Sequence, residues 1–411
     1  MKSCIVIGGG VVGLFTAYYL VKAGHKVKVI DAGDFSDGCS YGNAGMIVPS
    51  HVIPLAQPGM LAQGFKWMLK SQSPFYVKPR LSGDLFNWAY KFYKSANQNH
   101  VDNSKKALCG LSLFSKELYQ ELAETTSALD YQEKGLLMLY QSEKVGEEEI
   151  HAAKIAQELG LEVDFLNPLQ VANLETGLKT NVLGGVHFKS DAHLSPNQLM
   201  RFLKSELIER GANLQTKTQV LDFKISGNKI NSVITNKGEF SGDEIIISAG
   251  AWSAGIAKKI NIKISLLPGK GYSFNQELPE KKPTIPAILC EGKVAVSPIN
   301  NCIRFGGTME ITHSNDRKIN LNRVQGIVNT INNFYPDLNI SLPEEKNIWH
   351  GYRPCSPTGL PIISRANKYS NLIIATGHSM MGLSLAPATG KLVQEIIDEK
   401  KLSVEIERFV F

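Results

Sequence analysis

The chain has 411 residues, 43% of them hydrophobic and 20% charged, so it can bury a large core, and both a disordered chain and a fibre are excluded. Its formal net charge of +6 is spread along the sequence without a block of like charge, so charge alone identifies no partner, and we expect no nucleic acid. The 6 cysteines form no CxxC pair and no metal-ligand spacing. We therefore expect reduced thiols, no metal site and a cytoplasmic location.

The first feature along the chain is a nearly apolar stretch from Cys4 to Leu20. Its 17 residues just reach the length of a membrane-spanning helix, and a secretory signal would look similar. A spanning helix has little use for four glycines in its first half, because glycine weakens helices, whereas a strand that leads into a phosphate-binding turn requires them. The sequence therefore favours a strand and a turn over a membrane anchor.

A complete strand–helix–strand unit can be read from the start of the chain. Lys2–Ile7 predict a buried strand, and the apolar helical pattern that follows stops at Ala23-Gly24. A second strand, Lys26–Ile30, ends at the acidic Asp31. Between the first strand and the helix lies Gly8-Gly9-Gly10-Val11-Val12-Gly13, and Asp31 follows its last glycine by 18 residues. In this context the GxGxxG pattern predicts a dinucleotide-binding site.

Each glycine of this pattern has a physical role. Gly8 allows the tight turn out of the strand, Gly10 lets backbone N–H groups approach a pyrophosphate, and Gly13 lets helix and strand pack closely. The helix N-terminus adds partial positive charge. Asp31 would accept hydrogen bonds from the ribose of the adenosine. The alternative is a glycine-rich turn in a doubly wound fold that binds nothing.

A second segment punctuated by glycines runs from Gly33 to Val48. Within it, the small residues of Asn43-Ala44-Gly45-Met46-Ile47 leave room for a flat ring. This composition predicts a second contact with the cofactor, although a flexible connector has a similar composition.

Residues 51–100 are rich in aromatic residues, proline and lysine. Such a segment forms either an apolar and basic membrane-binding surface or helices that cover the substrate site. We favour the helices, because aromatic side chains usually face a core. If the segment binds a membrane instead, we expect Trp67 and Trp88 to contribute.

The remaining chain alternates between helices and short strands. Helices are predicted at 105–122, 147–159 and 198–210, and strands at 219–225, 229–235, 244–248, 264–267, 294–296 and 303–306. The later strands suggest an antiparallel sheet. Because no repeat and no low-complexity linker occur, we expect interleaved rather than consecutive domains.

Three later motifs are suited to contact with a ligand. The small residues of Ser248–Ser253 follow a buried strand and let its end lie against a dinucleotide. Gly351-Tyr352-Arg353-Pro354 places an arginine in what we expect to be a rigid turn. Gly377–Leu383 precedes a helix that we expect to start near Pro387, and a glycine loop at a helix N-terminus can stabilise negative charge.

Together with Lys270-Gly271-Tyr272-Ser273, these motifs resemble, in the same order and over residues 4–398, the FAD-dependent D-amino acid oxidase superfamily, and within it the bacterial D-amino acid dehydrogenases. The resemblance implies an α/β fold in which a Rossmann-like FAD-binding domain is interleaved with an α+β substrate domain built on an antiparallel sheet. The implied FAD-binding segments are 1–85, 185–255 and 350–411. The implied substrate segments are 86–184 and 256–349.

The resemblance also implies noncovalently bound FAD. The adenine half would lie on the first strand–helix–strand unit with a main-chain contact at Val220, and the isoalloxazine would lie near residues 43–46 with its N1/C2=O edge at Gly382 and Leu383. The residues expected to bind FAD are Gly8, Gly10, Val11, Val12, Gly13, Asp31, Ala32, Asn43, Ala44, Gly45, Met46, Val220, Gly250, Trp252, Gly351, Gly377, His378, Gly382 and Leu383.

Arg353 would hold the substrate carboxylate, by the resemblance and because its planar fork of donors suits two parallel hydrogen bonds. Tyr272 would bond the same carboxylate or shape a lid, or else pack in the core with a satisfied hydroxyl. These two are the candidate catalytic residues. His350 and His51 would line the substrate site and His378 would flank it, although a lone histidine is more often structural.

The implied reaction is hydride transfer from the substrate Cα to flavin N5, giving an imino acid that water hydrolyses to a 2-oxo acid. Positioning dominates such a reaction, and no acid–base dyad is required. The expected substrate is a D-amino acid; the alternatives are a D-configured hydroxyproline, or glycine or sarcosine with oxygen as the acceptor.

The sequence also limits where the electrons go. A single GxGxxG gives no support to a second dinucleotide site, and a lone Cys39 in place of a cysteine pair makes a redox dithiol an unsupported choice. We therefore expect electrons to pass to oxygen, a quinone or a carrier protein. Peripheral contact with the inner face of the cell membrane is compatible with such an acceptor.

Overall fold

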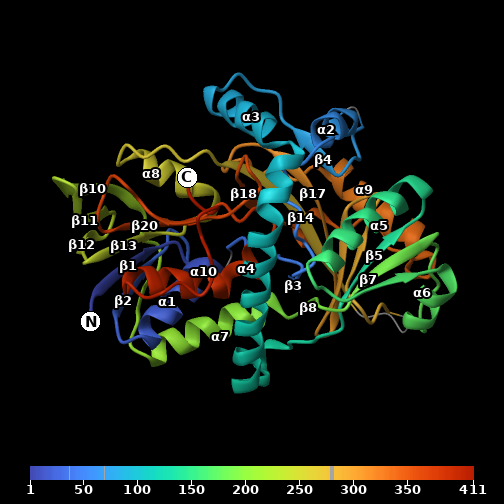
Figure 1. Cartoon of the computed structure of the whole chain (residues 1–411), viewed down its shortest axis with the longest axis horizontal. Helices are drawn as coiled ribbons and strands as arrows, with labels where there is room; N and C mark the ends of the chain where they lie inside the picture. Colours follow the sequence, from blue (N-terminus) through green and yellow to red (C-terminus); the bar gives the residue numbers. More distant parts are fainter. Residues whose placement is uncertain (37, 69, 278–281) are drawn as a thin grey trace.

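Two β-sheets, each with helices against it, form two lobes of the protein (Figure 1). The computed structural model describes residues 1–36, 38–68, 70–277 and 282–411. The sheet of the first lobe has 6 strands in the order β19-β20-β13-β1-β2-β9. Their bounds are β1 (Ser3–Ile7), β2 (Lys26–Ile30), β9 (Asn213–Gln215), β13 (Glu244–Ile247), β19 (Ile362–Arg365) and β20 (Leu372–Thr376).

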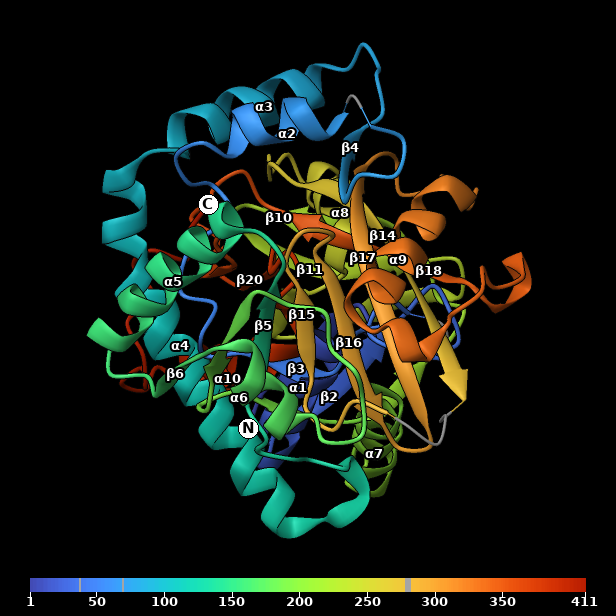
Figure 2. The ribbon, with the colours of Figure 1, turned by 90° about the vertical axis from the view of Figure 1, so that its right-hand side faces the viewer.

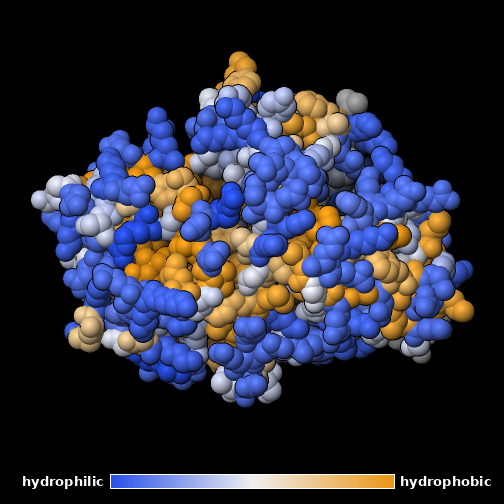
Figure 3. Space-filling view, in the orientation of Figure 1, coloured by the Kyte–Doolittle hydropathy of each residue, from blue (hydrophilic) through white to orange (hydrophobic). Residues whose placement is uncertain are grey.

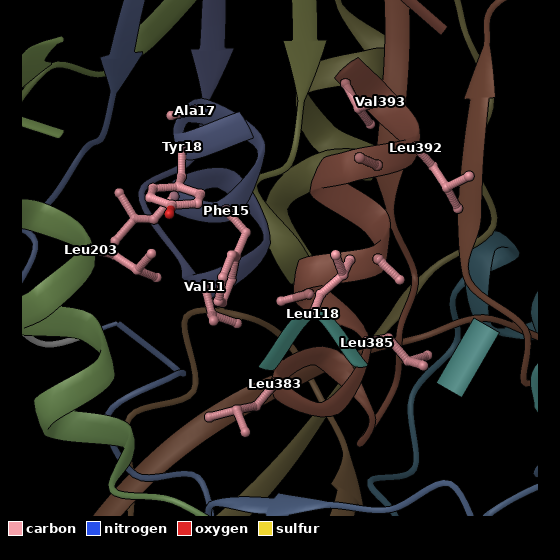
Figure 4. Packing of buried hydrophobic residues seen from close by; sticks show 14 of the residues in the cluster. Val11, Phe15, Ala17, Tyr18, Leu118, Leu203, Leu383, Leu385, Leu392 and Val393 are labelled. Carbon is pink, nitrogen blue, oxygen red and sulfur yellow. The ribbon is translucent and has the colours of Figure 1, made fainter. Parts of the chain in front are cut away.

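This first sheet is parallel except at its edge strand β19. Its inner strands β1, β13 and β20 are apolar and almost entirely buried, as expected for a parallel sheet covered on both faces. One face packs against α1 (Val11–Lys22), α7 (Pro196–Glu209) and α10 (Gly382–Ile397). Figure 4 shows the apolar side chains that fill the space between these helices.

The other face of the first sheet is covered by a three-stranded antiparallel meander and a short helix. These elements are β10 (Val220–Ser226), β11 (Lys229–Thr235), β12 (Gly238–Ser241) and α8 (Ser253–Lys258). The strand–helix–strand unit expected at the start of the chain is confirmed, because β1, α1 and β2 occupy the predicted places. Among the described residues, no helix is both long and apolar enough to cross a bilayer.

The sheet of the second lobe has 9 strands and is largely antiparallel. In order its strands are β18 (Trp349–Cys355), β14 (Leu267–Glu277), β17 (Cys302–Ile311), β16 (Val294–Ile299), β15 (Ala287–Leu289), β5 (Leu136–Tyr140), β7 (Gly184–Phe188) and β6 (Val163–Leu166), with β4 (Phe75–Val77) pairing with β17. The antiparallel sheet expected from the sequence is thus confirmed. The strand expected at 264–267 is misplaced, because β14 begins only at Leu267 and Ile264 packs in the core of the first lobe.

Helices cover both faces of the second sheet. On one face α9 (Leu321–Phe334) packs over β14, β16 and β17 (Figure 2). On the other face lie α5 (Glu143–Glu158) and the loop around Val48 and Val52. The short helix α6 (Pro168–Leu174) contacts β6 and β7. The face with Val48 is the one turned toward the first lobe.

Hydrogen bonding assigns three strands near the expected domain boundaries to the second sheet. The strands β4, β7 and β18 lie within, or at the start of, segments that the sequence analysis gave to the FAD-binding domain. The interleaved division remains a prediction. Sheet membership would move its boundaries past these three strands.

The long helix α4 (Gln98–Thr125) runs between the lobes and packs against α10 (Figure 1). The expectation that the last helix starts near Pro387 is wrong, because α10 begins at Gly382 and contains Pro387. A proline inside a helix leaves the carbonyl four residues earlier without its N–H donor. Here that carbonyl belongs to Leu383, and Tyr119 of α4 donates its hydroxyl to it at 2.8 Å. The tertiary contact replaces the hydrogen bond that the proline removes.

Helices α2 (Met60–Met68) and α3 (Gly83–Ser95) project together from one end of the molecule (Figure 2). Two aromatic residues on one side of α3, Trp88 and Phe92, are buried and stack at 5.1 Å between ring centroids. Trp88 also donates its indole N–H to the carbonyl of Cys355. The inner side of this arm (α2 and α3) therefore packs on the end of β18, as expected for helices that cover a site.

Candidate functional site

The turn after β1 requires glycine for both conformation and space. Gly8 has φ of 114°, and a Cβ there would lie 2.6 Å from the carbonyl oxygen of Ser248. A Cβ at Gly13 would clash with the carbonyl oxygen of Gly8, so helix α1 can approach β1 only without a side chain. The backbone of the turn is thus held close to the strand ends of the first sheet.

The N-terminus of α1 is open to a ligand. Its N-cap residue, Gly10, has no side chain to satisfy the first N–H groups, and the first turn contains no acidic residue. A Cβ at Gly10 would have only the Ser40 hydroxyl within 4 Å, at 3.7 Å, and that hydroxyl accepts the Val11 N–H at 3.0 Å. Val12 and Gly13 follow in the first turn. The N–H groups of Val12 and Gly13 and the helix dipole fit a pyrophosphate.

Asp31 lies at the adjoining end of β2. Its carboxylate accepts the Gly9 N–H at 2.6 Å and the Gly33 N–H at 2.7 Å, which ties the glycine turn after β1 to the backbone that follows Ala32. Carboxylate oxygens can accept further hydrogen bonds, so the carboxylate retains acceptor capacity for a ribose. The Thr218 N–H binds the Asp31 carbonyl at 2.7 Å, and this contact brings the start of β10 alongside.

The structure brings the remaining adenosine-side candidates to the same edge of the first sheet. Val220, at the start of β10, follows the segment that pairs with Asp31. Gly250 has φ of 54°, and the space where its Cβ would lie is free of atoms within 4 Å. Trp252 is 46% exposed and packs edge-on against Tyr352, with 5.7 Å between ring centroids.

The loop of Asn43, Ala44 and Gly45 has a defined conformation. The Asn43 side chain accepts the Gly45 N–H at 2.8 Å, and Gly45 has φ of 79°. The Gly45 carbonyl accepts the Leu194 N–H at 2.9 Å. The next residues, Met46–Ile47, form β3, which pairs with β8 (Ala192–His193). The backbone is therefore held on both sides of the loop, which a flexible connector would not be.

Side chains of the second sheet fasten the preceding part of this loop. Arg304 of β17 donates from one nitrogen, Nη1, to the carbonyls of Tyr41 and Asn43, both at 2.8 Å. Ser273 of β14 donates to the carbonyl of Gly42 at 3.0 Å. Burial lowers the pKa of Arg304. The sequence analysis missed Arg304 and Ser273, because only the fold brings residues so distant in sequence to this loop.

Arg353 lies in a strand, and the rigid turn expected for Gly351–Pro354 is therefore wrong. In β18 it pairs with Gly269, and its guanidinium lies over Gly271, where a Cβ would clash with it. Nη1 donates to the carbonyl of Thr308 at 2.6 Å. Burial lowers the pKa of Arg353, but guanidinium stays protonated in proteins, so its other N–H groups remain donors.

Tyr272 and His350 lie on the opposite face of the sheet from Arg353. Side chains alternate between faces along a strand, and Tyr272 pairs directly with His350 while Gly269 pairs with Arg353. The Tyr272 hydroxyl donates to Glu310 at 2.7 Å, and the side chain is 1% exposed. Of the alternatives for Tyr272, core packing with a satisfied hydroxyl is the one that fits; the contact with the carboxylate that Arg353 would hold does not.

The two remaining candidate histidines are buried and locally bonded. His378 shares a hydrogen bond with the Thr389 hydroxyl at 2.8 Å, and burial lowers its pKa to about 3. His51 approaches the Ser50 hydroxyl at 3.1 Å, and burial lowers its pKa to about 4. Both rings are therefore neutral at pH 7, and the hydrogen bond of His378 runs within its own helix and loop.

The end of β18 meets the N-terminus of α10. The Ser379 N–H binds the carbonyl of Pro354 at 3.1 Å, and Cys355 and His378 form an isolated antiparallel bridge. Gly377, directly before His378, has φ of 78°. Helix α10 then begins at Gly382 and Leu383 without a side-chain cap. A second uncapped helix N-terminus thus adjoins the strand of Arg353.

Two buried hydroxyls near this junction have no hydrogen-bond partner in the described part of the chain. They belong to Thr308, whose carbonyl binds Arg353, and to Ser379. Unpartnered buried polar atoms are rare in folded proteins and call for an explanation. Together with the free guanidinium N–H groups, they are what a polar ligand at the Arg353 face would satisfy.

A family model described as DAO, FAD dependent oxidoreductase, matches residues 3–396. The chain belongs to this family. It is 30% identical over 396 residues to a D-amino acid dehydrogenase of Helicobacter pylori, with 96% of this chain and 94% of that protein covered. It is also 30% identical over 419 residues to one of Vibrio atlanticus (strain LGP32), with 99% of each chain covered.

Solved structures of low sequence identity share the fold of this DAO-family chain. A glycine oxidase from Geobacillus kaustophilus aligns with a TM-score of 0.80 and 22% identity, covering 100% of this chain and 98% of that one. An L-proline dehydrogenase from P. horikoshii aligns with a TM-score of 0.77 and 21% identity, covering 100% and 96%. The α/β fold expected from the sequence is thereby confirmed.

The DAO-family chain is an FAD-dependent oxidoreductase, and its geometry fits that cofactor. The uncapped α1 N-terminus and the Gly8 turn suit a pyrophosphate, and Asp31 suits a ribose. The loop at Asn43 lies between these groups and the strand of Arg353. The chain that follows Asp31 thus runs from the glycine turn of the first lobe to the sheet that carries the buried Arg353 guanidinium.

Proposed function

We propose that the protein oxidises the Cα–N bond of a D-amino acid, with Arg353 holding the substrate carboxylate. One observation carries the proposal: the Arg353 guanidinium lies over Gly271, which pairs with Gly351 of the neighbouring strand. This face of the second sheet is the one that contacts the loop of Asn43, Ala44 and Gly45, where the flavin ring would lie. The D-configuration is supported by the two relatives at 30% identity, which are D-amino acid dehydrogenases. A carboxylate is the group that a planar, buried fork of donors recognises best.

The proposed reaction needs FAD and water besides the chain. FAD, held by the glycine turn and the N-terminus of α1, would supply a two-electron oxidant for the hydride of the substrate Cα. The amine nitrogen would release a proton to solvent as the C=N bond forms, and water would then convert the imino acid to a 2-oxo acid and ammonia. Arg353 fixes one end of the substrate, which leaves rotation of the Cα–H toward the cofactor as the remaining freedom.

The other candidates have supporting parts in this proposal. The main chain at Gly8, Gly10 and Gly13 would hold noncovalent FAD by its pyrophosphate. The N-terminus of α10, at Gly382 and Leu383, would supply hydrogen-bond donors to the electron-rich edge of the flavin ring. His378 would take part through its main chain, because its ring is bonded to Thr389.

A spectroscopic panel tests this function. The holoenzyme, which should be yellow, is mixed without oxygen with D- and L-enantiomers of several amino acids, with glycine and sarcosine, and with D-hydroxyproline. We expect bleaching of the flavin bands by D-amino acids. Bleaching by L-enantiomers alone would contradict the proposal, and bleaching by sarcosine or D-hydroxyproline alone would replace the substrate class. Reoxidation by oxygen or by a water-soluble quinone then identifies the acceptor.

We further propose that the arm (α2 and α3) contacts a membrane surface. Phe86, Tyr90 and Tyr93 lie at helical spacing on the outer side of α3 and are each more than half exposed, and Leu81 is 96% exposed. Figure 3 shows apolar atoms at the tip of this arm. The exposed lysines 66, 70, 91 and 94 surround it, which favours anionic lipid headgroups.

Trp88 cannot contribute to membrane binding, and that expectation is wrong, because its side chain is 8% exposed and points into the core. Co-sedimentation with vesicles containing phosphatidylserine tests the surface. A Phe86→Ser/Tyr93→Ser variant should lose binding, whereas Leu169→Ser, at an exposed apolar residue of α6, should not. Equal binding of both variants would contradict the assignment.

A further inference from the structure

Two paired glycines lie beneath two large side chains on the Arg353 face. Gly271 of β14 pairs directly with Gly351 of β18. Directly paired residues point to the same face, and so do alternate residues along a strand, so Trp349 and Arg353 flank Gly351 on this face. A Cβ at Gly351 would clash with the Trp349 indole, and a Cβ at Gly271 would clash with the Arg353 guanidinium. Both side chains therefore lie down over the bare backbone.

A third glycine receives the other side of the indole. A Cβ at Gly42 would clash with ring atoms of Trp349, and the backbone of Gly42 is not in the left-handed region. Glycine is thus needed at this position for space and not for conformation. The carbonyl of Gly42 is bonded to Ser273, so the loop cannot move away from the sheet without losing that hydrogen bond.

We propose that Trp349 is a positioning residue whose indole sets the spacing between the strand of Arg353 and the loop of Gly42. The inference rests on the proposed function, in which Arg353 holds the substrate and the loop adjoins the flavin. An indole is rigid and fills the space between Gly351 and Gly42, while hydrogen bonds from Arg304 and Ser273 pull the loop toward the sheet. The position of the loop is thus set by the indole on one side and by three hydrogen bonds to the sheet on the other.

Spacing matters more to hydride transfer than to binding. A displacement of about 1 Å at the reacting atoms can cost about a hundredfold in rate. Arg353 lies on the other side of Gly351 from Trp349, so its proposed contact with the carboxylate does not depend on the loop. Loss of the indole should therefore slow the chemical step and leave the affinity for a carboxylate nearly unchanged.

Rapid-mixing reduction of the holoenzyme and titration with propionate test this split. For Trp349→Ala we expect the limiting rate of flavin reduction to fall about a hundredfold, with the propionate dissociation constant changed less than about threefold. We expect the visible circular dichroism of the bound FAD to change as well. Trp349→Phe, which keeps a flat ring, should recover most of the rate. If Trp349→Ala fails to retain FAD, Trp349→Leu takes its place.

A double-mutant cycle with Gly42→Ala isolates the contact. The added methyl group should displace the indole and reproduce the rate defect and the spectral change. In a Trp349→Ala background the same substitution should have no further effect, because the clash is gone. Gly255→Ala, at an exposed helical glycine with no atom within 4 Å of the added Cβ, is the matched control.

Three results would overturn the proposal. An unchanged reduction rate in Trp349→Ala would show that the spacing does not matter. A parallel loss of propionate affinity would make Trp349 a direct binding residue. Additive effects in the cycle would show that the contact between Trp349 and Gly42 does not control the rate. If no amino acid reduces the wild-type flavin, the proposed function fails, while the spectral change and the cycle measured on FAD affinity still decide the role of Trp349.

Discussion

The two faces of the β14–β18 strand pair differ sharply although they share one backbone. On the face toward the first lobe, glycines carry no side chains, and among the described residues the Arg353 guanidinium has one hydrogen-bond partner, the Thr308 carbonyl. On the α9 face, Glu310 contacts Tyr272 at 2.7 Å and Arg323 at 3.1 Å. The first face therefore has hydrogen-bond donors available for a ligand, whereas on the α9 face these polar groups bind one another.

The same pair of strands thus contributes to stability on one face and to ligand binding on the other. Breaking a buried ion pair leaves an uncompensated charge, so we expect the network on the α9 face to matter for stability. An arginine with unused donors on the other face is suited to an outside carboxylate. Substitutions on the two faces should therefore have opposite signatures: loss of activity with stability retained, or loss of stability with activity retained.

Arg353→Ala should give the largest effect on activity. Removal of the guanidinium should lower kcat/KM for the preferred amino acid by about a thousandfold, or about 4 kcal/mol, because a charged hydrogen-bonded contact is lost. FAD content and the thermal midpoint should stay close to wild type. Steady-state kinetics and calorimetry check this. A variant that keeps its substrate affinity would remove Arg353 from the carboxylate site.

Glu310→Gln should give the opposite signature. It leaves the buried Arg323 without its counter-charge and weakens the environment of Lys270, whose ammonium lies 3.6 Å from the Glu310 carboxylate. We expect a loss of about 3 kcal/mol in the free energy of unfolding. Urea denaturation of the holoenzyme measures it. A large fall in substrate affinity at unchanged stability would break the comparison between the faces.

Tyr272→Phe tests the α9 face at a residue that the sequence analysis made a candidate catalytic residue. Loss of its hydroxyl removes one hydrogen bond to Glu310 and should cost about 1 kcal/mol of stability. The reduction rate and substrate affinity should be nearly unchanged. Rapid-mixing kinetics decide the matter, since a strong rate defect would return Tyr272 to the catalytic residues.

Asp316 should give the smallest effect, a modest loss of stability near neutral pH that disappears in acid. Its pKa is lowered, against the opposing effect of burial, by hydrogen bonds with Lys78 and Thr312 and by the charge of Lys270. A lowered folded-state pKa stabilises the fold above the unfolded value of about 4, and this stability is lost as the pH falls further. Asp316→Asn should therefore flatten the decline of the unfolding free energy below about pH 4. An unchanged slope would show that other carboxylates control it.

Local patterns predicted the parts of the fold that local patterns determine. β2 was predicted at its observed bounds, and the turn at Gly8 was recognised because glycine spacing and strand ends are adjacent in sequence. The later helices were located approximately. The start of α10 was missed, since the hydroxyl of Tyr119, far away in sequence, is what allows Pro387 inside the helix.

The candidate site was predictable at the level of motifs and not of faces. Arg353 could be named from its motif, but its strand conformation comes from pairing with β14, which lies about 80 residues earlier. The same register puts Tyr272 on the far face, which no pattern around that residue reveals. Arg304, Ser273 and Trp349 gain their roles only where the two lobes meet.

The order of strands in the first sheet has a consequence for synthesis on the ribosome. β1 at residues 3–7 is flanked by β13, and β13 in turn by β20, which ends at Thr376. A nascent polypeptide therefore lacks a finished nucleotide cradle until nine-tenths of it has been translated. Capture of the yellow cofactor is accordingly a late event in the life of each new molecule, and fragments released early would remain colourless.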